Sequence, residues 1–445
     1  MKLRSYQDVK KFLEKHIPAK DDRSDGVHKF ERALRFMELL GDPQNKVRVI
    51  HIAGTSGKGS TAQCISHILT AHGFKTGLTI SPHIRDVRER TQINDKKISA
   101  VKYREYLNEM VPYILKMDES TYGPLTFFEI TMAHAYYSFW REKVEYAIVE
   151  TGMGGRLDAS NTATGPDKMC VLTKIGLDHQ EFLGNTIAAI ASEKAGIIHK
   201  GNTVLSLPQS REVTQVFKEV AGRKGASLIA ADAPQSLIMT SAFTQYDFSY
   251  KACDIRALQI SLHGLFQAEN TSLAIATACE LGQRDGFAVD EIVVRNVVKS
   301  IHIPGRFQII SHGEHDIIID GAHNPQKMEA FISSLKTLYP LEKFDFVLAF
   351  KKGKDFVQML QASIPLAAHI YVTEFAVNNQ GLILSSVPVE DIATNLDLVG
   401  YNSYTINTDA KQAFASATSL SKRRIVITGS MYLVSELYGE LKKRE

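Results

Sequence analysis

Residues 47–61 read VRVIHIAGTSGKGST. The β-branched residues at the start of this stretch favour an extended strand, and Gly54, Gly57 and Gly59 let the following backbone N–H groups turn into one concavity. Apolar residues at helical spacing follow, so the positive end of a helix faces the same concavity. The stretch therefore predicts a strand, an anion-binding turn and a helix, with Lys58 beside a bound phosphate.

The turn differs from the usual phosphate loop, in which four residues separate two glycines and a Ser or Thr follows the Lys directly. Here only Thr55 and Ser56 stand between the first two glycines, and Gly59 precedes Ser60. A glycine-rich turn that only links a strand to a helix is the alternative interpretation. The strand, the lysine, the Ser-Thr pair and the helix all occur in order, and this combination favours phosphate binding.

The composition excludes several classes of protein. The chain has 445 residues, which is too long for a single hydrophobic core and indicates two or three domains. Its 52 Lys and Arg residues nearly balance 49 Asp and Glu residues, so the net charge of +3 gives no broad cationic field for nucleic acid or an anionic membrane. We expect no nucleic-acid partner and no membrane association.

The cysteines and the N-terminus indicate the compartment. The cysteines lack the paired spacing of metal sites or disulfide frameworks, which is typical of packing residues in a reducing compartment. The N-terminus contains no apolar export segment, and no stretch is long enough to span a membrane. We therefore expect a cytoplasmic protein. The four cysteines are Cys64, Cys170, Cys253 and Cys279.

The N-terminal part of the chain alternates between strands and helices. Strands are predicted at residues 76–80, 146–150 and 169–175, and helices at 101–117 and 126–142. Residues 85–97 are polar with charges of both signs, and we expect a mobile loop there. Alternation of this kind predicts an α/β fold with a mostly parallel sheet that is covered on both faces.

The C-terminal part is predicted to form a smaller α/β unit with helices between its strands. We expect strands at residues 316–320, 344–349, 370–373 and 425–428. The turn Pro304-Gly305-Arg306 marks its start, so the predicted domains are residues 1–300 and 301–445. Arg306 carries a permanent charge on a planar fork, which suits a hinge that closes on phosphate; an ordinary linker arginine is the alternative.

Four residues with oxygen or nitrogen donors fall near the predicted strand ends: Ser60, Ser81, Glu150 and His179. In parallel sheets, ligands bind outside the carboxyl ends of the strands. Carboxylate, hydroxyl and phosphate oxygens suit Mg²⁺, with the imidazole as an unusual nitrogen ligand. The alternatives are an exposed strand-end carboxylate and an ordinary surface histidine.

Lys194 stands out among the lysines. Together with Ile187, Ile190 and Ala191 it follows the i, i+3, i+4, i+7 spacing of an apolar helix face, so we expect it to be desolvated. Desolvation favours the neutral amine, which can add CO₂ to form a carbamate anion, and a carbamate can bind a metal. The alternative is a lysine that extends its ammonium group to water.

The same residues carry a resemblance to a known family. Residues 54–60, 81–83, 150–156, 177–179 and 193–197 occur in the order and spacing of folylpolyglutamate synthases, which are relatives of the Mur ligases. The similarity continues through residues 266–270, 304–306, 320–325 and 429–434, so it covers most of the chain. It implies an N-terminal P-loop ATPase-like domain and a smaller C-terminal Rossmann-like domain.

The resemblance also implies roles for individual residues. ATP would be bound by Gly54, Thr55, Gly57, Lys58, Gly59, Ser60, Thr61, Asn270, Arg306 and Asp320. Mg²⁺ would be held by Ser81, Glu150, His179 and a carbamylated Lys194. Catalytic roles would fall to Lys58, Lys194 and His323. The pterin substrate would be lined by Thr126, Phe127, Phe128, Glu129, Leu157, Asp158 and Ala159.

Two stretches depart from the pattern of the family. Ser56 replaces the usual Asn of the phosphate loop. Residues 90–95 read RTQIND where the family has Arg-Ile-x-Ile-Asn-Gly. The second departure lies in a substrate-side loop, so it bears on the form of folate that is accepted.

We expect a monomeric, ATP-dependent amide ligase that adds L-glutamate to a folate. Whether it also adds L-glutamate to dihydropteroate is left open by the sequence. A carboxylate is a poor electrophile, so ATP would convert it to an acyl phosphate, and the glutamate amine would then attack. Two other functions remain open from sequence. One is a Mur-like ligase with another acid substrate, and the other is a nucleotide-gated ATPase that does not ligate.

Overall fold

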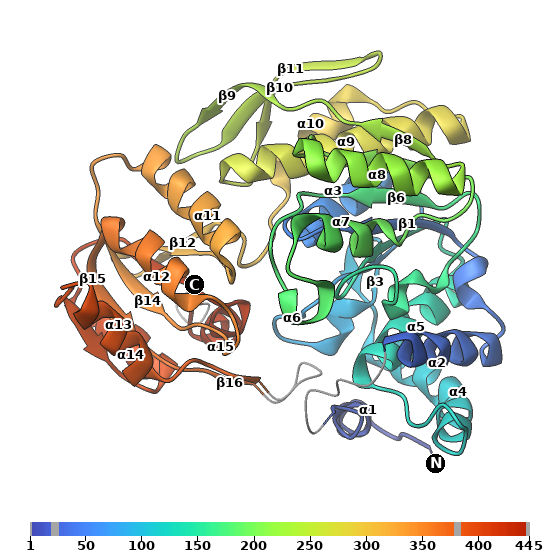
Figure 1. Ribbon diagram of the computed structural model, residues 1–445, viewed down its shortest axis with the longest axis horizontal. Helices are drawn as coiled ribbons and strands as arrows, with labels where there is room; N and C mark the ends of the chain where they lie inside the picture. The colour runs from blue at the N-terminus through green and yellow to red at the C-terminus, as the bar shows by residue number, and fades with distance from the viewer. Residues whose placement is uncertain (1, 19–25, 378–383, 442–445) are drawn as a thin grey trace.

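The computed structural model describes residues 2–18, 26–377 and 384–441 of the chain. Two α/β units lie side by side, each built around its own sheet, and a small third sheet lies above the N-terminal unit (Figure 1). The described residues contain no helix that is long and apolar enough to cross a membrane.

The sheet of the N-terminal unit has eight strands in the order β4-β3-β2-β5-β1-β6-β7-β8. Six neighbouring strands of this sheet are parallel: β2, β5, β1, β6, β7 and β8. The short strands β3 and β4 add an antiparallel edge beside β2. Their bounds are β1 (Arg48–Ala53), β2 (Thr76–Thr79), β3 (Gln92–Ile93), β4 (Lys96–Lys97), β5 (Tyr146–Glu150), β6 (Met169–Leu172), β7 (Thr203–Ser206) and β8 (Ser227–Ala230). The predicted mostly parallel sheet is confirmed, with the phosphate-turn strand β1 in its middle.

Residues 85–97, predicted as a mobile loop, form regular structure. A 3₁₀ helix at Val87–Arg90 is followed by the β3–β4 hairpin, and β3 pairs with β2 through Gly77 and Leu78. Asn94 and Asp95 adopt left-handed conformations at the hairpin turn, which Asn and Asp tolerate better than most residues. The prediction failed because a two-residue strand is too short to show an alternating pattern.

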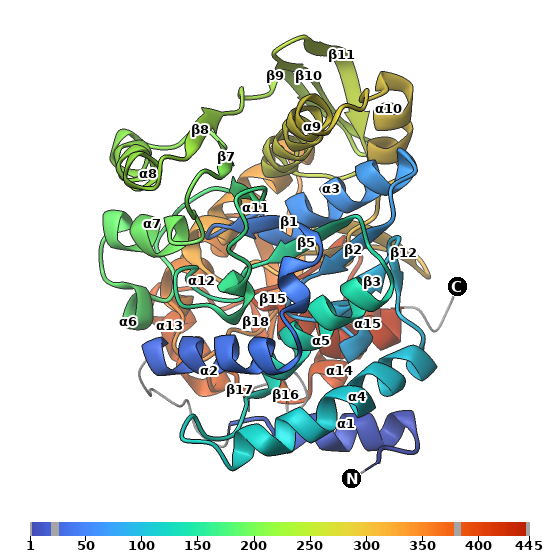
Figure 2. The same cartoon turned by 90° about the vertical axis from the view of Figure 1, so that its right-hand side faces the viewer.

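Helices cover both faces of this sheet (Figure 2). Ile50 and Ile52 of β1 pack in a core with α3 (Lys58–Ala71) and α9 (Leu265–Asp285), whereas Val49 points into a second core with α4 (Ala100–Asp118) and α5 (Phe127–Arg141). This alternation fixes the register of β1 and hence the place where its phosphate turn emerges. The remaining helices of the unit are α1 (Tyr6–Glu14), α2 (Gly26–Leu39), α6 (Gln180–Leu183), α7 (Ile187–Ala195), α8 (Arg211–Lys224) and α10 (Glu291–Ser300), with 3₁₀ turns at Pro43–Asn45 and Ala159–Thr162.

A three-stranded antiparallel sheet was not predicted from the sequence. It consists of β9 (Gln235–Met239), β10 (Thr244–Tyr250) and β11 (Cys253–Ile260). Its inward side chains, among them Tyr246 and Leu258, join the core of α3 and α9. The sheet therefore holds α9 in place, and α9 carries Asn270 to the phosphate turn.

The C-terminal unit contains a six-stranded sheet in the order β12-β13-β19-β14-β15-β18. The five strands from β13 to β18 are parallel, and β12 is an antiparallel edge. Each of the four predicted strands is present. The strands are β12 (Gln308–His312), β13 (His315–Ile319), β14 (Phe344–Leu348), β15 (Ala367–Val372), β18 (Tyr404–Ile406) and β19 (Ile425–Thr428), with a separate pair β16 (Ala376–Val377) and β17 (Leu384–Ser385).

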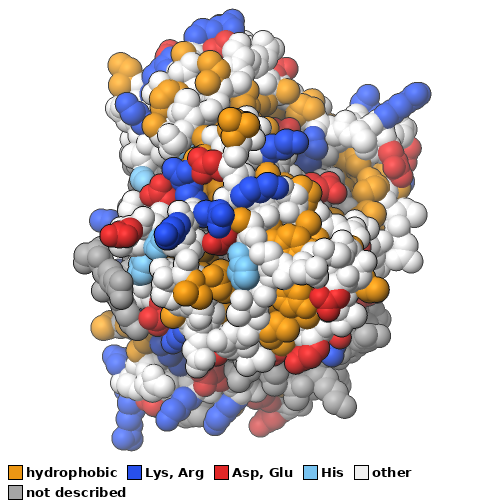
Figure 3. Space-filling view, turned by 90° about the vertical axis from the view of Figure 1, so that its left-hand side faces the viewer, with side chains coloured by type: hydrophobic (Ala, Val, Ile, Leu, Met, Phe, Trp, Pro, Cys, Tyr) orange, Lys and Arg blue, Asp and Glu red, His pale blue; other side chains and the backbone are white. Residues whose placement is uncertain are grey.

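Five helices cover this second sheet, with one core on each of its faces. They are α11 (Pro325–Leu338), α12 (Phe356–Ser363), α13 (Val389–Leu398), α14 (Ala410–Leu420) and α15 (Met431–Leu441), with a 3₁₀ turn at Ile364–Leu366. On the outward face of this unit, Lys and Arg side chains are interspersed with Asp, Glu and hydrophobic groups (Figure 3). α11 begins beside the N-terminal unit, which places its first turn at the junction of the two units.

Candidate active site

One cavity of about 1030 Å³ lies where the two units meet. Every residue that the sequence predicted for ATP, metal, substrate or catalysis lines it, with the exception of Thr61. Thr61 was predicted to bind ATP, but it is fully buried and its hydroxyl lies 3.5 Å from the carbonyl oxygen of Asn270. The side chain of Thr61 packs α3 against α9 behind the phosphate turn, and its role in ATP binding stays a prediction.

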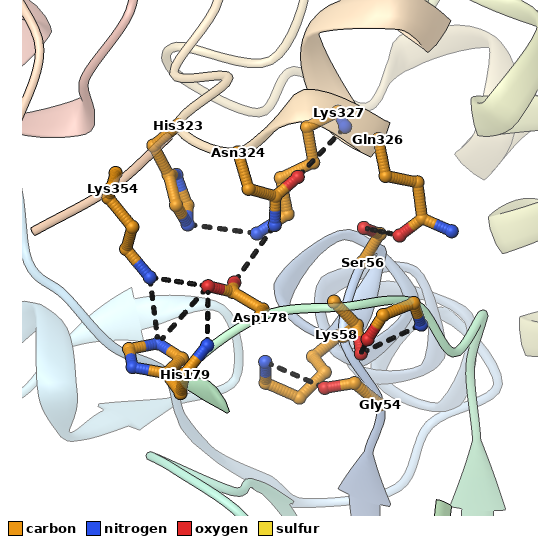
Figure 4. Close-up of polar contacts among 12 residues, drawn as sticks. Gly54, Ser56, Lys58, Asp178, His179, His323, Asn324, Gln326, Lys327 and Lys354 are labelled. Atoms are coloured by element: carbon orange, nitrogen blue, oxygen red, sulfur yellow. Dashed lines mark hydrogen bonds and ion pairs between the residues drawn. The ribbon is translucent and has the colours of Figure 1, made fainter. Parts of the chain in front are cut away.

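The phosphate turn has the conformation that its glycines allow. Gly57 has φ = 90°, and a Cβ there would lie 2.1 Å from Oδ1 of Asn270. Lys58 begins α3, and its Nζ donates to the carbonyl oxygen of Gly54 at 3.1 Å (Figure 4). The Thr55 hydroxyl donates to the carbonyl oxygen of Gly176 at 3.0 Å and ties the turn to the segment after β6. The N-terminus of a 14-residue helix thus faces the cavity, ready for an anion.

The first turn of α11 docks on the phosphate turn from the other unit. Ser56 Oγ donates to Gln326 Oε1 at 3.0 Å, and Gln326 Nε2 donates to the carbonyl oxygen of Ile175 at 3.2 Å. Asn324 Nδ2 donates to Asp178 Oδ2 at 2.9 Å, and the side chain of Asn324 also caps α11. These side chains close the junction directly over the turn (Figure 4).

Two of the predicted metal ligands lie together at the end of β5. Glu150 is buried, and its Oε2 accepts a 2.9 Å hydrogen bond from the backbone N–H of Ser81. Burial raises the pKa of Glu150, while Lys58 and Arg306 act against that shift. Among the residues that the structure describes, no three His, Cys, Asp or Glu side chains group as a metal site.

His179 lies past β6 and has a different environment. Burial and the nearby Lys354 lower its pKa to about 3, so the imidazole is neutral near pH 7. Its Nε2 lies 3.4 Å from Nζ of Lys354, which also binds Asp178. A neutral imidazole retains a lone pair that a metal ion can use.

Lys194 is buried as its position on the apolar helix face predicted. Only 4% of the residue is exposed, and Ile190 and Ala191 of the same helix are fully buried. Burial and the neighbouring Lys58 lower the pKa of Lys194 to about 7. Its side chain therefore carries a substantial fraction of neutral amine at neutral pH.

Arg306, Asp320 and His323 reach the cavity from the C-terminal unit. Burial raises the pKa of Asp320 to about 6, although Arg306 acts against it, and Asp320 Oδ2 accepts a 2.8 Å hydrogen bond from the N–H of Phe307. Arg306 influences Asp320 and Glu150 alike, so its guanidinium lies between the two units. His323 is held by a 2.8 Å contact between its Nδ1 and the carbonyl oxygen of Gly321.

The predicted substrate segments form the other side of the cavity. Thr126 caps α5, and the Glu129 carboxylate accepts a hydrogen bond from the backbone N–H of Thr126 and pairs with the buried Arg32 at 3.0 Å. Asp158 is buried and accepts from the N–H of Met153 at 2.8 Å and from the hydroxyl of Ser160. An aromatic and acidic wall of this kind suits a flat, polar heterocycle.

Comparison with known proteins agrees with this architecture. The family described as Mur ligase middle domain matches residues 52–278, and the family described as dihydrofolate synthetase, C-terminal domain, matches residues 305–440. The chain is 30% identical over 416 residues to the dihydrofolate synthase/folylpolyglutamate synthase of Bacillus subtilis, covering 92% of this chain and 94% of that one. The chain belongs to the folylpolyglutamate and dihydrofolate synthase family.

Two further members of the family show the same extent of similarity. The dihydrofolate synthetase of Saccharomyces cerevisiae is 30% identical over 423 residues, covering 91% of this chain and 96% of that one. A folylpolyglutamate synthase of Mycobacterium tuberculosis, solved with ADP and AMPPCP, has a TM-score of 0.87 at 28% identity over 98% of both chains. The predicted Mur ligase fold and the class of ATP-dependent ligase are thereby confirmed.

The two departures from the family pattern have structural explanations. Ser56 contributes the hydrogen bond to Gln326 that joins the two units. Asp95, where the family has Gly, takes the left-handed conformation with φ = 60° and accepts a 2.6 Å hydrogen bond from Ser66. Asp95 does not line the cavity, so this departure affects the hairpin turn, and within residues 90–95 only Arg90 lines the cavity.

Asp178, Lys327 and Lys354 are among the cavity residues that were given no role from the sequence. Burial alone would raise the pKa of Asp178, but Lys327 and Lys354 hold it well below its usual range. Lys354 forms an ion pair with Asp178 across the two units (Figure 4). The signal in the sequence was the run Lys351-Lys352-Gly353-Lys354 directly after a predicted strand, at the end of the sheet where ligands bind.

Proposed function

We propose that this enzyme joins L-glutamate to a folate-type carboxylate, with consumption of ATP and through an acyl phosphate. The acceptors that we propose are tetrahydrofolate and its polyglutamates, joined through the γ-carboxyl, and 7,8-dihydropteroate. The observation that carries the proposal is the shared cavity: the phosphate turn, the buried acidic and aromatic wall, and the basic groups of the C-terminal unit all line it.

The first step requires stabilisation of negative charge. The backbone N–H groups of the turn and Lys58 bind the phosphates of ATP, and Arg306 contacts them from the opposite unit. The folate carboxylate then attacks the γ-phosphorus, the bond to ADP breaks, and charge develops on the transferring phosphoryl oxygens. The docking of α11 over the turn excludes water, which protects the acyl phosphate from hydrolysis.

The residues present fit a magnesium ion. Glu150 supplies a buried carboxylate, Ser81 a hydroxyl and His179 a neutral imidazole, and phosphate oxygens and water supply the remaining ligands that Mg²⁺ usually keeps. Bound Mg²⁺ would neutralise charge on the phosphates during transfer.

Lys194 is proposed to carry a carbamate in the active enzyme. Its burial and its pKa of about 7 favour the neutral amine, which adds to CO₂ with loss of one proton. The resulting anion places oxygen donors near Lys58, where an ammonium would only add repulsion. A negative charge on the Lys194 side chain, in place of a positive one, suits a site that has to hold both a metal ion and a phosphate.

The second step joins the amine to the activated carbon. The glutamate amine attacks the acyl phosphate, the carbon–oxygen bond breaks and phosphate leaves. Both His323 and Asp320 lie on the C-terminal side of the cavity, where they orient the amine or the nucleotide. We further propose that residues 1–300 and 301–445 act as two domains that close on the substrates, in a cytoplasmic, monomeric enzyme.

The experiment is a substrate panel. Dihydropteroate, dihydrofolate and tetrahydrofolate are each incubated with ATP, Mg²⁺ and glutamate, and ADP and product masses are recorded. The proposal predicts ADP release only when a folate-type acid and glutamate are both present, with a product heavier by one glutamyl residue. Release of ADP without either substrate would identify a non-ligating ATPase instead.

A further inference from the structure

Lys327 lies in the first turn of α11, at the junction of the two units, and the reaction described above gives it no role. Its Nζ is 2.9 Å from Nε2 of His323, while Nδ1 of the same ring is 2.8 Å from the carbonyl oxygen of Gly321. A carbonyl oxygen can only accept, so Nδ1 carries the hydrogen and Nε2 is the acceptor for Lys327. Lys327 therefore occupies the only lone pair of the His323 ring (Figure 4).

The charges around Lys327 are predominantly positive. Lys58 faces it from the phosphate turn, and Arg306 and Lys354 face it from the C-terminal unit. Asp178 is the strongest compensating charge, but it already binds Lys354 and Asn324. Burial and these cations lower the pKa of Lys327 well below its usual range. Lys327 in turn acts to lower the pKa of three acidic groups, which are Asp178, Glu150 and Asp320.

A phosphate group in this cavity reverses that balance. The positive end of α11 and the amine of Lys327 then face Lys58 across the anion, so Lys327 gains a partner of opposite charge. A lysine has a flexible stem of four carbons and can move its amine by several ångströms without any backbone shift. Its present hydrogen bond to a neutral imidazole is weaker than a charge-assisted bond to phosphate.

We propose that Lys327 is a second phosphate-binding lysine that blocks His323 until a phosphate is bound. When nucleotide enters, Lys327 takes up a proton from solvent and leaves Nε2 of His323 for a phosphate oxygen. The exposed Nε2 then accepts a hydrogen bond from the glutamate ammonium group and positions its nitrogen, because burial and the nearby lysines keep the pKa of His323 well below its usual range. This inference rests on the proposed ligase function and extends it to the positioning of the amine in the second step.

The proton balance of that step is complete. The glutamate ammonium group loses one proton to solvent, and its nitrogen lone pair, positioned by Nε2 of His323, forms the bond to the acyl carbon. The carbon–oxygen bond to the phosphoryl group breaks, and the second proton of the amine leaves with the phosphate. The proposal therefore makes positioning of the amine conditional on the presence of phosphate, which prevents His323 from taking part before the nucleotide is bound.

The first test is calorimetry of ATP binding with Mg²⁺, without any folate, in buffers with different ionisation enthalpies. We expect the wild-type protein to take up protons near neutral pH and Lys327→Met to take up fewer. Lys327→Arg keeps its charge at all accessible pH values, so it also takes up fewer protons, yet it retains ATP affinity. Lys336→Met, at an exposed position of the same helix, is the matched control and should behave as wild type.

The second test is steady-state ligation as a function of pH. Loss of one charge-assisted contact predicts about a tenfold or larger increase of the KM for ATP in Lys327→Met, with partial rescue in Lys327→Arg. The alkaline decline of kcat/KM for ATP should be absent in Lys327→Arg, because arginine does not titrate there.

The outcomes separate this inference from the proposed function. Unchanged proton uptake and an unchanged KM for ATP in both Lys327 variants, in an enzyme that ligates normally, would overturn the inference alone. An increased KM for glutamate with a normal KM for ATP would also overturn it, because Lys327 would then bind the amino acid. If the wild-type protein binds ATP but ligates no folate, the proposed function fails while the calorimetric comparison still decides the phosphate contact.

Discussion

The hydroxyl of Ser56 in the phosphate turn donates a 3.0 Å hydrogen bond to Gln326 in the first turn of α11. Gln326 in turn donates to the carbonyl oxygen of Ile175, so one side chain of the C-terminal unit holds both segments beside the phosphate site. The junction between the two units is thus built directly beside the turn that we propose binds the nucleotide. Mutations here test whether closure and ATP binding are coupled.

Gln326→Ala should weaken ATP binding with little loss of stability. The variant removes two interunit hydrogen bonds, each worth about 1 kcal/mol, so we expect the KM for ATP to rise by about threefold to tenfold. Gln361→Ala, at an exposed position on α12, is the matched control. ATP kinetics and melting temperatures decide the matter. A large fall in melting temperature with normal ATP kinetics would show that the contact is structural only.

Lys58→Ala should abolish ligation and leave the fold intact. The Lys58 side chain makes a hydrogen bond to the carbonyl oxygen of Gly54 at the edge of the cavity, so its removal creates no buried cavity in the core. Circular dichroism and ADP release measure the two effects, with Lys218→Ala on α8 as the control. Normal turnover in the folded variant would disprove the phosphate-turn assignment.

Two glycine variants separate strain from contact. Gly57→Ala and Gly73→Ala each force a residue with a positive φ to carry a Cβ, which costs roughly 1 kcal/mol of stability. The Cβ at Gly57 would also meet Asn270 at 2.1 Å, whereas no atom lies within 4 Å at Gly73. We therefore expect a larger fall in melting temperature in Gly57→Ala than in Gly73→Ala, and a loss of ATP binding in Gly57→Ala only. Equal ATP affinity in both variants would contradict the proposed contact between Asn270 and the turn.

Arg306→Ala should raise the KM for ATP more than Arg306→Lys does, because the lysine keeps the charge but not the planar fork. We expect about a tenfold or larger effect for alanine, since a charge-assisted contact is lost, and a smaller one for lysine. Steady-state kinetics with ATP as the varied substrate and thermal melting of both variants are the measurements. Normal ATP kinetics with reduced stability would identify Arg306 as a linker residue.

The carbamate on Lys194 should depend on pH with a defined sign. Its pKa is lowered to about 7, so the neutral amine increases as pH rises through that value. At constant dissolved CO₂ we expect the ¹³C carbamate signal to grow from about one pH unit below this pKa to about one unit above it. Lys168, whose pKa is lowered to about 8 by burial, is an internal comparison because it lies away from the cavity. A bare Lys194 amine in fully active enzyme would refute the carbamate.

Much of the architecture could be predicted because it depends on local patterns. The strand, turn and helix of residues 47–61 were predicted correctly, since glycines and apolar spacing act within a few residues. The β9–β11 sheet was missed, although Tyr246, Phe248 and Tyr250 of β10 alternate with more exposed polar residues, because its place in the fold depends on packing against α9. Secondary structure in residues 85–97 was missed for a similar reason: the hairpin exists only as an edge added to β2.

Part of the site could be predicted, because several of its residues lie at the ends of predicted strands. Residues at strand ends, such as Glu150, converge because the topology of a parallel sheet brings those ends together. The contacts of Asp178 with Asn324 and Lys354 could not be predicted, since they join residues from separate units. The motif also does not show that the side chain of Thr61 lies on the side of α3 that packs against α9. Pairings between units depend on how the two sheets dock, which local sequence does not encode.

The acyl phosphate is the central claim, and isotope transfer tests it most directly. The acceptor, dihydropteroate or tetrahydrofolate, is prepared with ¹⁸O in the reacting carboxyl group and incubated with ATP, Mg²⁺ and glutamate. If the carboxylate attacks the γ-phosphorus, one ¹⁸O atom from each turnover appears in the released phosphate, and mass spectrometry of that phosphate detects it. The account predicts this transfer in parallel with formation of the glutamyl product. Phosphate that contains no ¹⁸O beside normal product formation would contradict it.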